Sequence, residues 1–290
     1  MLFIIDRIGR SRILNAFLIA WACCMLSACS VTSLMFYPSQ KIPVLPDQLG
    51  VRYEEVTHVA KDGVQLVSWR MFSETTPARG IIIYLHGNAQ NISYHQLNVN
   101  WLPQHGYDVF LLGYREYGHS QGLAKLPDVF WDFHSALDWV LKHYDEQTPI
   151  YVLAQSMGGS IAVNGIATHT DGEKIRAVFL DGTFDSYPGM AQTALSRSWI
   201  TWLFQWPASW MTKEHDPEYW ITQWPPVPLM ITHSPADRVV PYEKGRRLFE
   251  VASEPKQWID NSGPHIATFR DKQMRDALLS FFARADQEIR

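Results

Sequence analysis

Cysteine is nearly absent from this chain, and its few occurrences lie together near one end. The sequence contains three cysteines, Cys23, Cys24 and Cys29, and none follows Cys29. The remainder of the chain therefore holds no disulfide bond. Histidines and cysteines also do not cluster at the spacing of metal ligands, so we expect neither a metal nor another cofactor.

A strong charge imbalance and internal repetition are also lacking. The formal net charge is −4, which does not indicate a nucleic-acid partner. No repeat or low-complexity tract interrupts the 290 residues, of which 47% are hydrophobic and 19% charged. This is ordinary globular composition, and the length suffices for one large α/β domain.

The sequence also lacks a clear membrane-spanning run near its start. Ile13–Met25 is mostly apolar but short for a span, and it follows a positive region that contains Arg7, Arg10 and Arg12. This layout is typical of a secretory signal peptide.

The residues that end this region, Leu26–Cys29, resemble the lipobox of bacterial lipoproteins. The resemblance implies a signal peptide over residues 1–28 and an acylated Cys29 that anchors the protein to a membrane. Ser30 after the cysteine implies a place in the bacterial cell envelope, at the outer membrane and facing the periplasm. A plain signal peptide or a short anchor helix is the alternative. Residues 29–50 carry three prolines without periodicity and are predicted to be a tether.

Residues 51–290 show the pattern of one α/β domain. Val51–Ala60 and Val64–Phe72 flank an Asp-Gly turn, which predicts a β-hairpin. Short apolar runs typical of buried strands then alternate with segments of helical periodicity. These runs are Gly80–Leu85, Val109–Leu112, Ile150–Ala154, Ala177–Leu180 and Leu229–Thr232, and Lys256–Ile259 is expected to be a further short strand. Such alternation predicts a mostly parallel central sheet flanked by helices.

The alternation is interrupted at about residues 185–226. This segment holds six of the twelve tryptophans, and Trp199, Trp202 and Trp206 recur at helical spacing. We expect a short helical cap insert that packs its apolar face on the main body. A lid that forms part of the substrate pocket and a membrane-facing surface are two functional alternatives.

A serine stands at the centre of the chain, where a buried strand turns into a helix. Ser156 lies between Ala154 and Gly158, in a pattern close to the G-x-S-x-G of a nucleophile elbow. The tight turn of an elbow leaves room only for small residues two positions away on either side. An ordinary strand–loop–helix connection with a solvated serine is the alternative.

A serine nucleophile requires a base and an acid, which in the elbow fold follow in the order serine, acid, histidine. His265 is the one histidine beyond Asp237, and it stands between the last expected strand and the last helix. Asp237 follows the strand that ends at Thr232 and is the preferred acid, with Asp181 and Asp185 as alternatives. His233 is expected to be a wall residue if it lies near the site.

Two backbone N–H groups are predicted to stabilise the oxyanion. One is that of Met157, which begins the helix after the serine. The other is that of Asn88, in the turn after Gly80–Leu85, where Gly87 permits close approach of the backbone. His86 and Tyr117 are candidates for the pocket or cap.

Four segments together resemble the α/β-hydrolase superfamily in the right order. They are His86–Asn91, Tyr114–Gly122, Ala154–Ser160, and the pair His233–Pro241 with Gly263–His265. The resemblance is strongest to small serine hydrolases with an HGN-type oxyanion turn, which include protein depalmitoylases and bacterial esterases. Two departures from the family pattern are Ala154 in the elbow and Glu116 in place of a glycine.

The resemblance implies a lipid-anchored serine hydrolase that cleaves carboxylic esters or thioesters, such as those of acyl chains like palmitate, through an acyl-enzyme. A peptidase or amidase that acts on small peptides or envelope fragments is one alternative. A catalytically idle envelope scaffold with a hydrolase fold is another.

Overall fold

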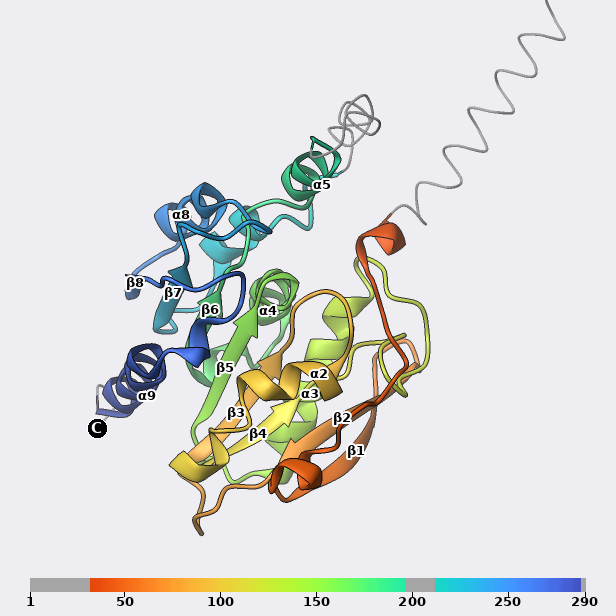
Figure 1. Ribbon diagram of the computed structural model, residues 1–290, viewed down its shortest axis with the longest axis vertical. Coiled ribbons are helices and arrows are strands. Elements are labelled where there is room, and N and C mark those ends of the chain that lie inside the picture. Colours follow the sequence, from red (N-terminus) through yellow and green to blue (C-terminus); the bar gives the residue numbers. More distant parts are fainter. Residues whose placement is uncertain (1–31, 197–211, 288–290) are drawn as a thin grey trace, which may run out of the picture.

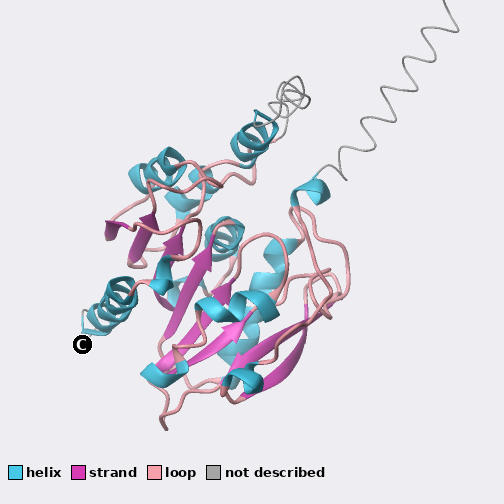
Figure 2. Ribbon diagram, in the orientation of Figure 1, coloured by secondary structure: helices cyan, strands magenta, loops and turns pink. Residues whose placement is uncertain are grey.

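The computed structural model describes residues 32–196 and 212–287, which fold around one central sheet (Figure 1). Eight strands form this sheet in the order β1-β2-β4-β3-β5-β6-β7-β8. Helices cover both of its faces, as the colouring by secondary structure shows (Figure 2). The expected fold class is confirmed: this is an α/β-hydrolase architecture.

The strands are those that the apolar runs predict, with small shifts at their ends. They are β1 (Tyr53–Val59), β2 (Gln65–Met71), β3 (Gly80–Leu85), β4 (Tyr107–Leu111), β5 (Ile150–Gln155), β6 (Ile175–Asp181), β7 (Leu229–His233) and β8 (Lys256–Asp260). The first two form the expected antiparallel hairpin, and β2 also pairs antiparallel with β4. All pairings from β3 to β8 are parallel.

The helices that cover the sheet are α2 (Ile92–His95), α3 (Val129–His143), α4 (Met157–Thr168), α5 (Tyr187–Ser196), α7 (Pro217–Trp220), α8 (Tyr242–Val251) and α9 (Lys272–Gln287). Short 3-10 turns complete the described chain: η1 (Thr32–Met35), η2 (Pro46–Leu49), η3 (Gln96–Asn98), η4 (Pro103–His105), η5 (Gly172–Lys174), η7 (Ile221–Gln223) and η8 (Thr268–Arg270).

The strands divide their side chains between two buried clusters. In β3, Ile81, Ile83 and Leu85 face the cluster that includes α3, α4 and α8, while Ile82 and Tyr84 face the cluster that includes α9. A parallel strand covered on both faces is apolar at every position, which is why such strands appear in the sequence as continuous hydrophobic runs. The carboxyl ends of β5, β7 and β8 consequently meet at one edge of a rigid sheet.

The segment before β1 lies on the domain surface. Phe36 is buried in the cluster that includes α3, and Pro46 is buried at the start of η2. Val44 N–H donates to Ser93 Oγ at 3.1 Å, and Ser93 Oγ donates back to Val44 O at 2.6 Å. In Figure 1 this red-to-orange segment runs from η1 at the upper end to η2 at the lower edge. The described part of the predicted tether is therefore docked, because its apolar residues find partners on the domain.

The cap insert is described at its two ends. The first end is α5, which projects at the upper end of the molecule, at the same end as η1 (Figure 1). The second end holds α7 and η7, where Trp224 Nε1 donates to Val163 O of α4 at 2.8 Å. The described parts are helical and fasten the insert to the main body. Across residues 32–196 and 212–287, no helix has the length and apolar character that a membrane crossing requires.

Candidate active site

Ser156 occupies a sharp turn between β5 and α4. Its φ of 53° and ψ of −122° lie in a region that residues other than glycine rarely adopt. The turn is held from both sides, because Ser156 N–H donates to Asp181 O at 2.8 Å and Thr183 Oγ1 donates to Ser156 O at 2.7 Å. Strain of this kind persists only where the surrounding structure fixes it.

The two glycines that follow the serine are required by close packing. A Cβ atom on Gly158 would lie 2.4 Å from Leu85 O, and one on Gly159 would lie 2.3 Å from Thr183 Oγ1. On the other side of the serine, Ala154 is fully buried in β5, between β3 and β6. The methyl group of Ala154, where the common motif has a glycine, is therefore accommodated in the core, and the elbow still forms.

His265 and Asp237 lie next to Ser156, although they follow other strands. His265 Nε2 is 2.9 Å from Ser156 Oγ, and His265 Nδ1 is 2.6 Å from Asp237 Oδ2. A carboxylate only accepts hydrogen bonds, so Nδ1 carries the proton and Nε2 is free to accept from the serine hydroxyl. The three residues follow β5, β7 and β8, and they form one hydrogen-bonded chain, the Ser156–His265–Asp237 cluster.

Asp237 is held by more partners than the sequence indicates. Its Oδ1 accepts the N–H groups of Val239 at 2.7 Å and Val240 at 3.0 Å, and its Oδ2 lies 3.4 Å from His233 Nε2. Burial by itself would raise the pKa of Asp237, but hydrogen bonds from His233 and His265 outweigh burial and hold the pKa well below its ordinary value. The carboxyl is therefore ionised wherever His265 requires an acceptor.

The expectation for His233 as a wall residue is wrong. Its side chain is fully buried behind Asp237, and its Nε2 donates to Val240 O at 3.0 Å. A Cβ atom on Gly245, at the start of α8, would lie 2.2 Å from His233 Nδ1, so α8 closes over the ring. The residue supports the acid from behind instead of lining a pocket.

The two alternative acids, Asp181 and Asp185, bond to partners other than His265. Asp181 accepts from Gln155 Nε2 at 2.7 Å and from Thr268 Oγ1 at 2.8 Å, and burial raises its pKa. Asp185 pairs with Lys244 Nζ at 3.2 Å. Gln155 also accepts the Tyr84 hydroxyl at 2.6 Å, so a buried polar network lies beneath the elbow. Sequence reasoning missed this network, although Gln155 is the one polar residue in an otherwise apolar strand.

The turn that carries Asn88 lies against the serine. A Cβ atom on Gly87 would lie 3.4 Å from Ser156 Cβ. His86 Nδ1 donates to Gly87 O at 2.7 Å. In the trans peptide between Gly87 and Asn88, the N–H of Asn88 points in the direction opposite to that carbonyl oxygen. The N–H of Met157 is the first of α4 and has no partner inside that helix. Both predicted donors therefore begin segments that adjoin Ser156.

The assignment of His86 and Tyr117 to a pocket or cap requires correction. Both side chains are buried beneath this turn. The ring of His86 stacks on that of His95 with centroids 4.9 Å apart, and the Tyr117 hydroxyl donates to Asn88 Oδ1 at 2.9 Å. Tyr37 N–H donates to the same hydroxyl at 3.2 Å, so the Tyr117 side chain bonds to the segment before β1 and to Asn88.

Several predicted residues lie outside the described residues. These are the lipidation candidate Cys29 and the tryptophans Trp199, Trp202 and Trp206 of the cap. Glu116, the second departure from the family pattern, is described: it adopts a positive φ of 72°, and its Oε2 accepts Ala124 N–H at 2.8 Å. Its charge is engaged in closing its own loop.

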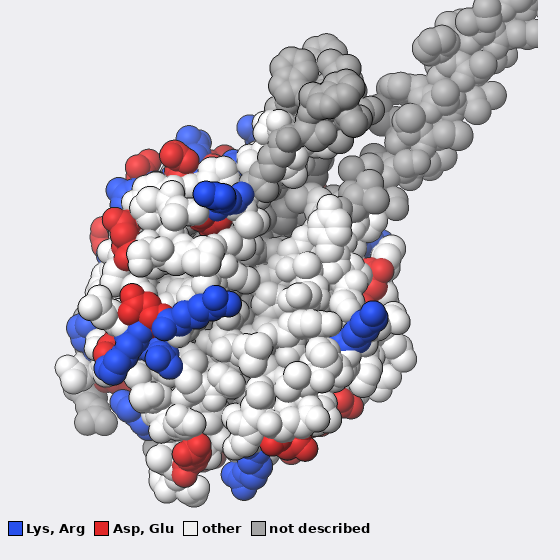
Figure 3. Space-filling model, in the orientation of Figure 1, with Lys and Arg blue, Asp and Glu red and all other residues white. Residues whose placement is uncertain are grey.

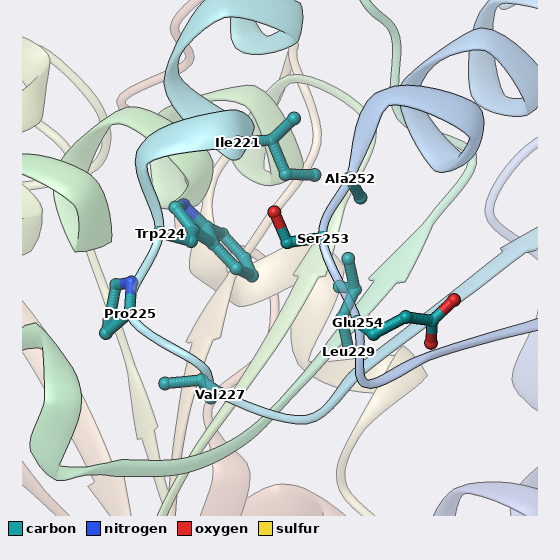
Figure 4. Close-up of a pocket in the computed structure, with 8 residues that line it drawn as sticks. All are labelled: Ile221, Trp224, Pro225, Val227, Leu229, Ala252, Ser253 and Glu254. Atoms are coloured by element: carbon teal, nitrogen blue, oxygen red, sulfur yellow. The ribbon is translucent and has the colours of Figure 1, made fainter.

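Two hollows are found away from the Ser156–His265–Asp237 cluster. The smaller, of about 10 Å³, lies between the end of the insert and the loop after α8 (Figure 4) and has room for about one water. The larger, of about 390 Å³, is lined by residues such as Phe72, Ser73 and Pro103, which precede β3 and β4. That hollow is at the amino ends of the parallel strands, opposite the edge that carries Ser156.

Within residues 32–196 and 212–287, no three His, Cys, Asp or Glu side chains are grouped so as to hold a metal ion.

Comparison with known proteins agrees with this geometry. Residues 76–227, just over half of the chain, match the family described as "Serine aminopeptidase, S33". The chain belongs to this family of α/β hydrolases. The expected resemblance to esterase-like α/β hydrolases is thereby confirmed at the level of family and fold.

Relatives and solved structures extend the same similarity. Protein YfhR of Escherichia coli (strain K12) is 34% identical over 261 residues, which cover 86% of this chain and 87% of that protein. The lysophosphatidylserine lipase ABHD12 of Xenopus tropicalis is 24% identical over 230 residues, 72% of this chain and 58% of that protein. The Pyrococcus furiosus esterase Pf2001 superposes with a TM-score of 0.70 at 20% identity, over 86% of this chain and 98% of that one, and has the same fold.

Proposed function

We propose that this hydrolase cleaves carboxylic esters or thioesters through an acyl-enzyme, with Ser156, His265 and Asp237 as its catalytic triad. One observation carries the proposal. The chain from Ser156 Oγ through His265 to Asp237 is continuous, with separations of 2.9 Å and 2.6 Å, and it begins at a strained elbow. A serine hydroxyl placed against a neutral, oriented imidazole is the arrangement that acyl transfer requires.

The mechanism follows from these contacts. Ser156 Oγ attacks the substrate carbonyl carbon while its proton passes to His265 Nε2, and Asp237 stabilises the imidazolium. The N–H groups of Asn88 and Met157 donate to the oxyanion. His265 then protonates the leaving alkoxide or thiolate, and the acyl group remains on the serine. A water molecule then attacks the acyl-enzyme. His265 accepts the proton of that water and later returns a proton to Ser156 Oγ, and the carboxylic acid is released.

Ester or thioester chemistry is favoured over peptide cleavage by the charges near the site. An aminopeptidase has to bind the positive amino group of its substrate, which requires an available carboxylate. Asp181, at the end of β6, bonds to Gln155 and Thr268, and Asp185 after it pairs with Lys244. Figure 3 shows one face of the molecule, on which charged side chains lie mostly toward the borders. The names of the Pyrococcus esterase and the Xenopus lipase support acyl substrates as well.

A peptidase or amidase is the second candidate, because the matched family is described by a serine aminopeptidase. An idle scaffold of the cell envelope is the third, although the intact Ser156–His265–Asp237 cluster argues against it.

A panel of p-nitrophenyl esters, from about two to sixteen carbons, and of aminoacyl p-nitroanilides separates the three candidates. We expect turnover of esters by the wild type and a loss of about 10⁴-fold or more in Ser156→Ala. Preferential anilide cleavage would support a peptidase. No turnover, together with a partner recovered by crosslinking, would support a scaffold.

Attachment to a membrane through an acylated Cys29, with residues 1–28 removed, is also part of the proposal. Thr32, the first described residue, is three positions after Cys29, and an extended chain of three residues spans at most about 11 Å. An acylated Cys29 would thus hold the η1 end of the fold close to the lipid surface. Metabolic labelling with an alkyne fatty acid tests this: the label should disappear in Cys29→Ser, and persistent labelling would contradict the anchor.

A further inference from the structure

The turn that follows β3 is strained at two consecutive residues. Ala89 and Gln90 have φ values of 65° and 62°, in the left-handed region that favours glycine. Such a conformation is unfavourable for a residue with a side chain and persists only when its surroundings fix it. These two residues come directly after Asn88, the proposed oxyanion donor, so whatever holds them also determines where that donor points.

The segment Met35–Lys41, here called the N-terminal strap, supplies many of those contacts. Its main chain binds the Asn88 side chain twice: Asn88 Nδ2 donates to Met35 O at 2.5 Å, and Tyr37 N–H donates to Asn88 Oδ1 at 3.0 Å. Asn88 Oδ1 also accepts its neighbour Ala89 N–H at 2.8 Å. One side chain thus joins the strap to the first strained residue.

The strap also pairs with the far end of the turn. Pro38 and Gln90 form an isolated parallel bridge, in which Ser39 N–H donates to Gln90 O at 3.0 Å. Asn91 Nδ2 donates to Ser39 O at 2.7 Å and to Lys41 O at 2.8 Å. The strap therefore grips the turn from Asn88 to Asn91, on both sides of the two residues with positive φ.

The strap is itself seated on the core. Phe36 is buried in the same cluster as Tyr117, whose hydroxyl lies between Tyr37 N–H and Asn88 Oδ1. By contrast, the hydrogen bonds and close contacts described above for Ser156, His265 and Asp237 involve no residue of the strap. Loss of the strap would disturb one half of the site and leave the other half in place.

We propose that the N-terminal strap is a positioning element that holds the oxyanion turn in its active conformation through Asn88, Gln90 and Asn91. This inference rests on the proposed serine-hydrolase function. Without the strap, the turn relaxes toward ordinary backbone angles and the Asn88 N–H moves away from the reacting oxygen. Substrate binding and the Ser156–His265–Asp237 cluster remain, so kcat falls while KM changes little.

Point variants of the full chain test the proposal. Asn88→Ala keeps the backbone N–H but removes the bonds to the strap, and we expect kcat to fall about 10- to 100-fold with KM within about 2-fold. Tyr117→Phe removes only the bridging hydroxyl and should have a smaller effect. Tyr151→Phe is the matched control, because it also removes one phenol hydrogen bond, to Asp286, away from the strap. Equal kcat values in Asn88→Ala and the wild type would overturn the proposal.

A double-mutant cycle separates a role through the strap from simple damage to the turn. Phe36→Ala unseats the strap without touching the turn, and combining it with Asn88→Ala should lower kcat by less than the product of the two single losses, because both variants remove contacts of the same strap. Additive losses would overturn the proposal.

Hydrogen exchange provides a readout that does not depend on activity: both variants should increase exchange at Ala89–Asn91 and leave exchange in the loops of Asp237 and His265 unchanged. If the wild type cleaves no ester, the proposed function fails, and unchanged exchange at the turn identifies failure of the strap separately.

Discussion

The two halves of the candidate site are held in different ways. The Ser156–His265–Asp237 cluster follows three parallel strands, and its partners come from the sheet edge itself, such as Asp181 O for Ser156 and His233 for Asp237. The turn at Asn88–Asn91 is instead bonded by a segment that precedes the first strand. The comparison teaches that the edge of the parallel sheet brings Ser156, His265 and Asp237 together, while the turn opposite them receives contacts from outside the sheet.

The largest effect that sharpens this comparison is expected at the acid. Asp237→Asn should lower kcat/KM about 10³- to 10⁴-fold, because an amide can present its N–H₂ to His265 and favour the wrong tautomer. The matched control is Asp185→Asn, which alters the other acid considered from the sequence and should remain within about 3-fold of the wild type. A larger loss in Asp185→Asn than in Asp237→Asn would reassign the acid.

A smaller effect is expected where the two halves touch. Gly158, near the start of α4, packs against Leu85 O and His86 O, and a Cβ atom added to it would lie 2.4 Å and 2.6 Å from them. Gly158→Ala should force the elbow and the oxyanion turn apart, lower kcat about 10- to 100-fold and reduce the free energy of unfolding by about 1–3 kcal/mol. Gly263→Ala is the control, because a Cβ atom there meets its nearest neighbour at 3.6 Å. Steady-state kinetics and urea unfolding measure both effects, and equal behaviour of the two variants would refute the packing argument.

The last prediction concerns the stability of the turn in acid, and no change of kcat is expected from it at neutral pH. Burial lowers the pKa of His95 to about 4, and burial together with His95 lowers the pKa of His86 well below its ordinary value. Between about pH 4 and pH 6.5 the unfolded chain binds protons that the folded turn excludes, so acidification favours unfolding. Stability is complete above pH 6.5 and falls by up to about 1.4 kcal/mol per pH unit for each such histidine as the pH drops toward 4.

Urea unfolding at several pH values measures this slope. His95→Gln should make the slope shallower, because the side chain no longer gains a proton on unfolding. His119→Gln serves as the control, since that ring is exposed. A slope in His95→Gln identical to that of the wild type would show that the buried imidazole does not limit acid stability.

Much of the fold follows from hydrophobic periodicity. The apolar runs and the Asp-Gly turn predict the strands, and the order of small motifs predicts that Ser156, Asp237 and His265 follow separate strand ends. These features depend on local patterns and on the topology of parallel sheets, which is why they are accessible without coordinates.

The features that the sequence does not reveal are tertiary. Residues 92–104 have a helical pattern, yet they form three short pieces, α2, η3 and η4. Asn91 caps the first piece, because its side chain accepts Ser93 N–H, and Pro103 begins the last. The prolines before residue 51 indicate a tether, whereas their neighbours bond to the turn at Asn88–Asn91. Gln155 carries no local signal for its partner Asp181, which reaches it only through the pairing of β5 with β6. His233 and Asp237 are four residues apart, but nothing in the local sequence shows that the loop after β7 turns the carboxylate back toward the ring.

The central claim is that Ser156 is the nucleophile of a serine hydrolase. Treatment of the full chain with a fluorophosphonate probe, followed by intact mass and peptide mapping, tests it most directly. We expect one probe per chain, attached at Ser156, with no labelling of Ser156→Ala and strongly slowed labelling of His265→Ala. Equal labelling of wild type and Ser156→Ala, or attachment at another residue, would contradict the account.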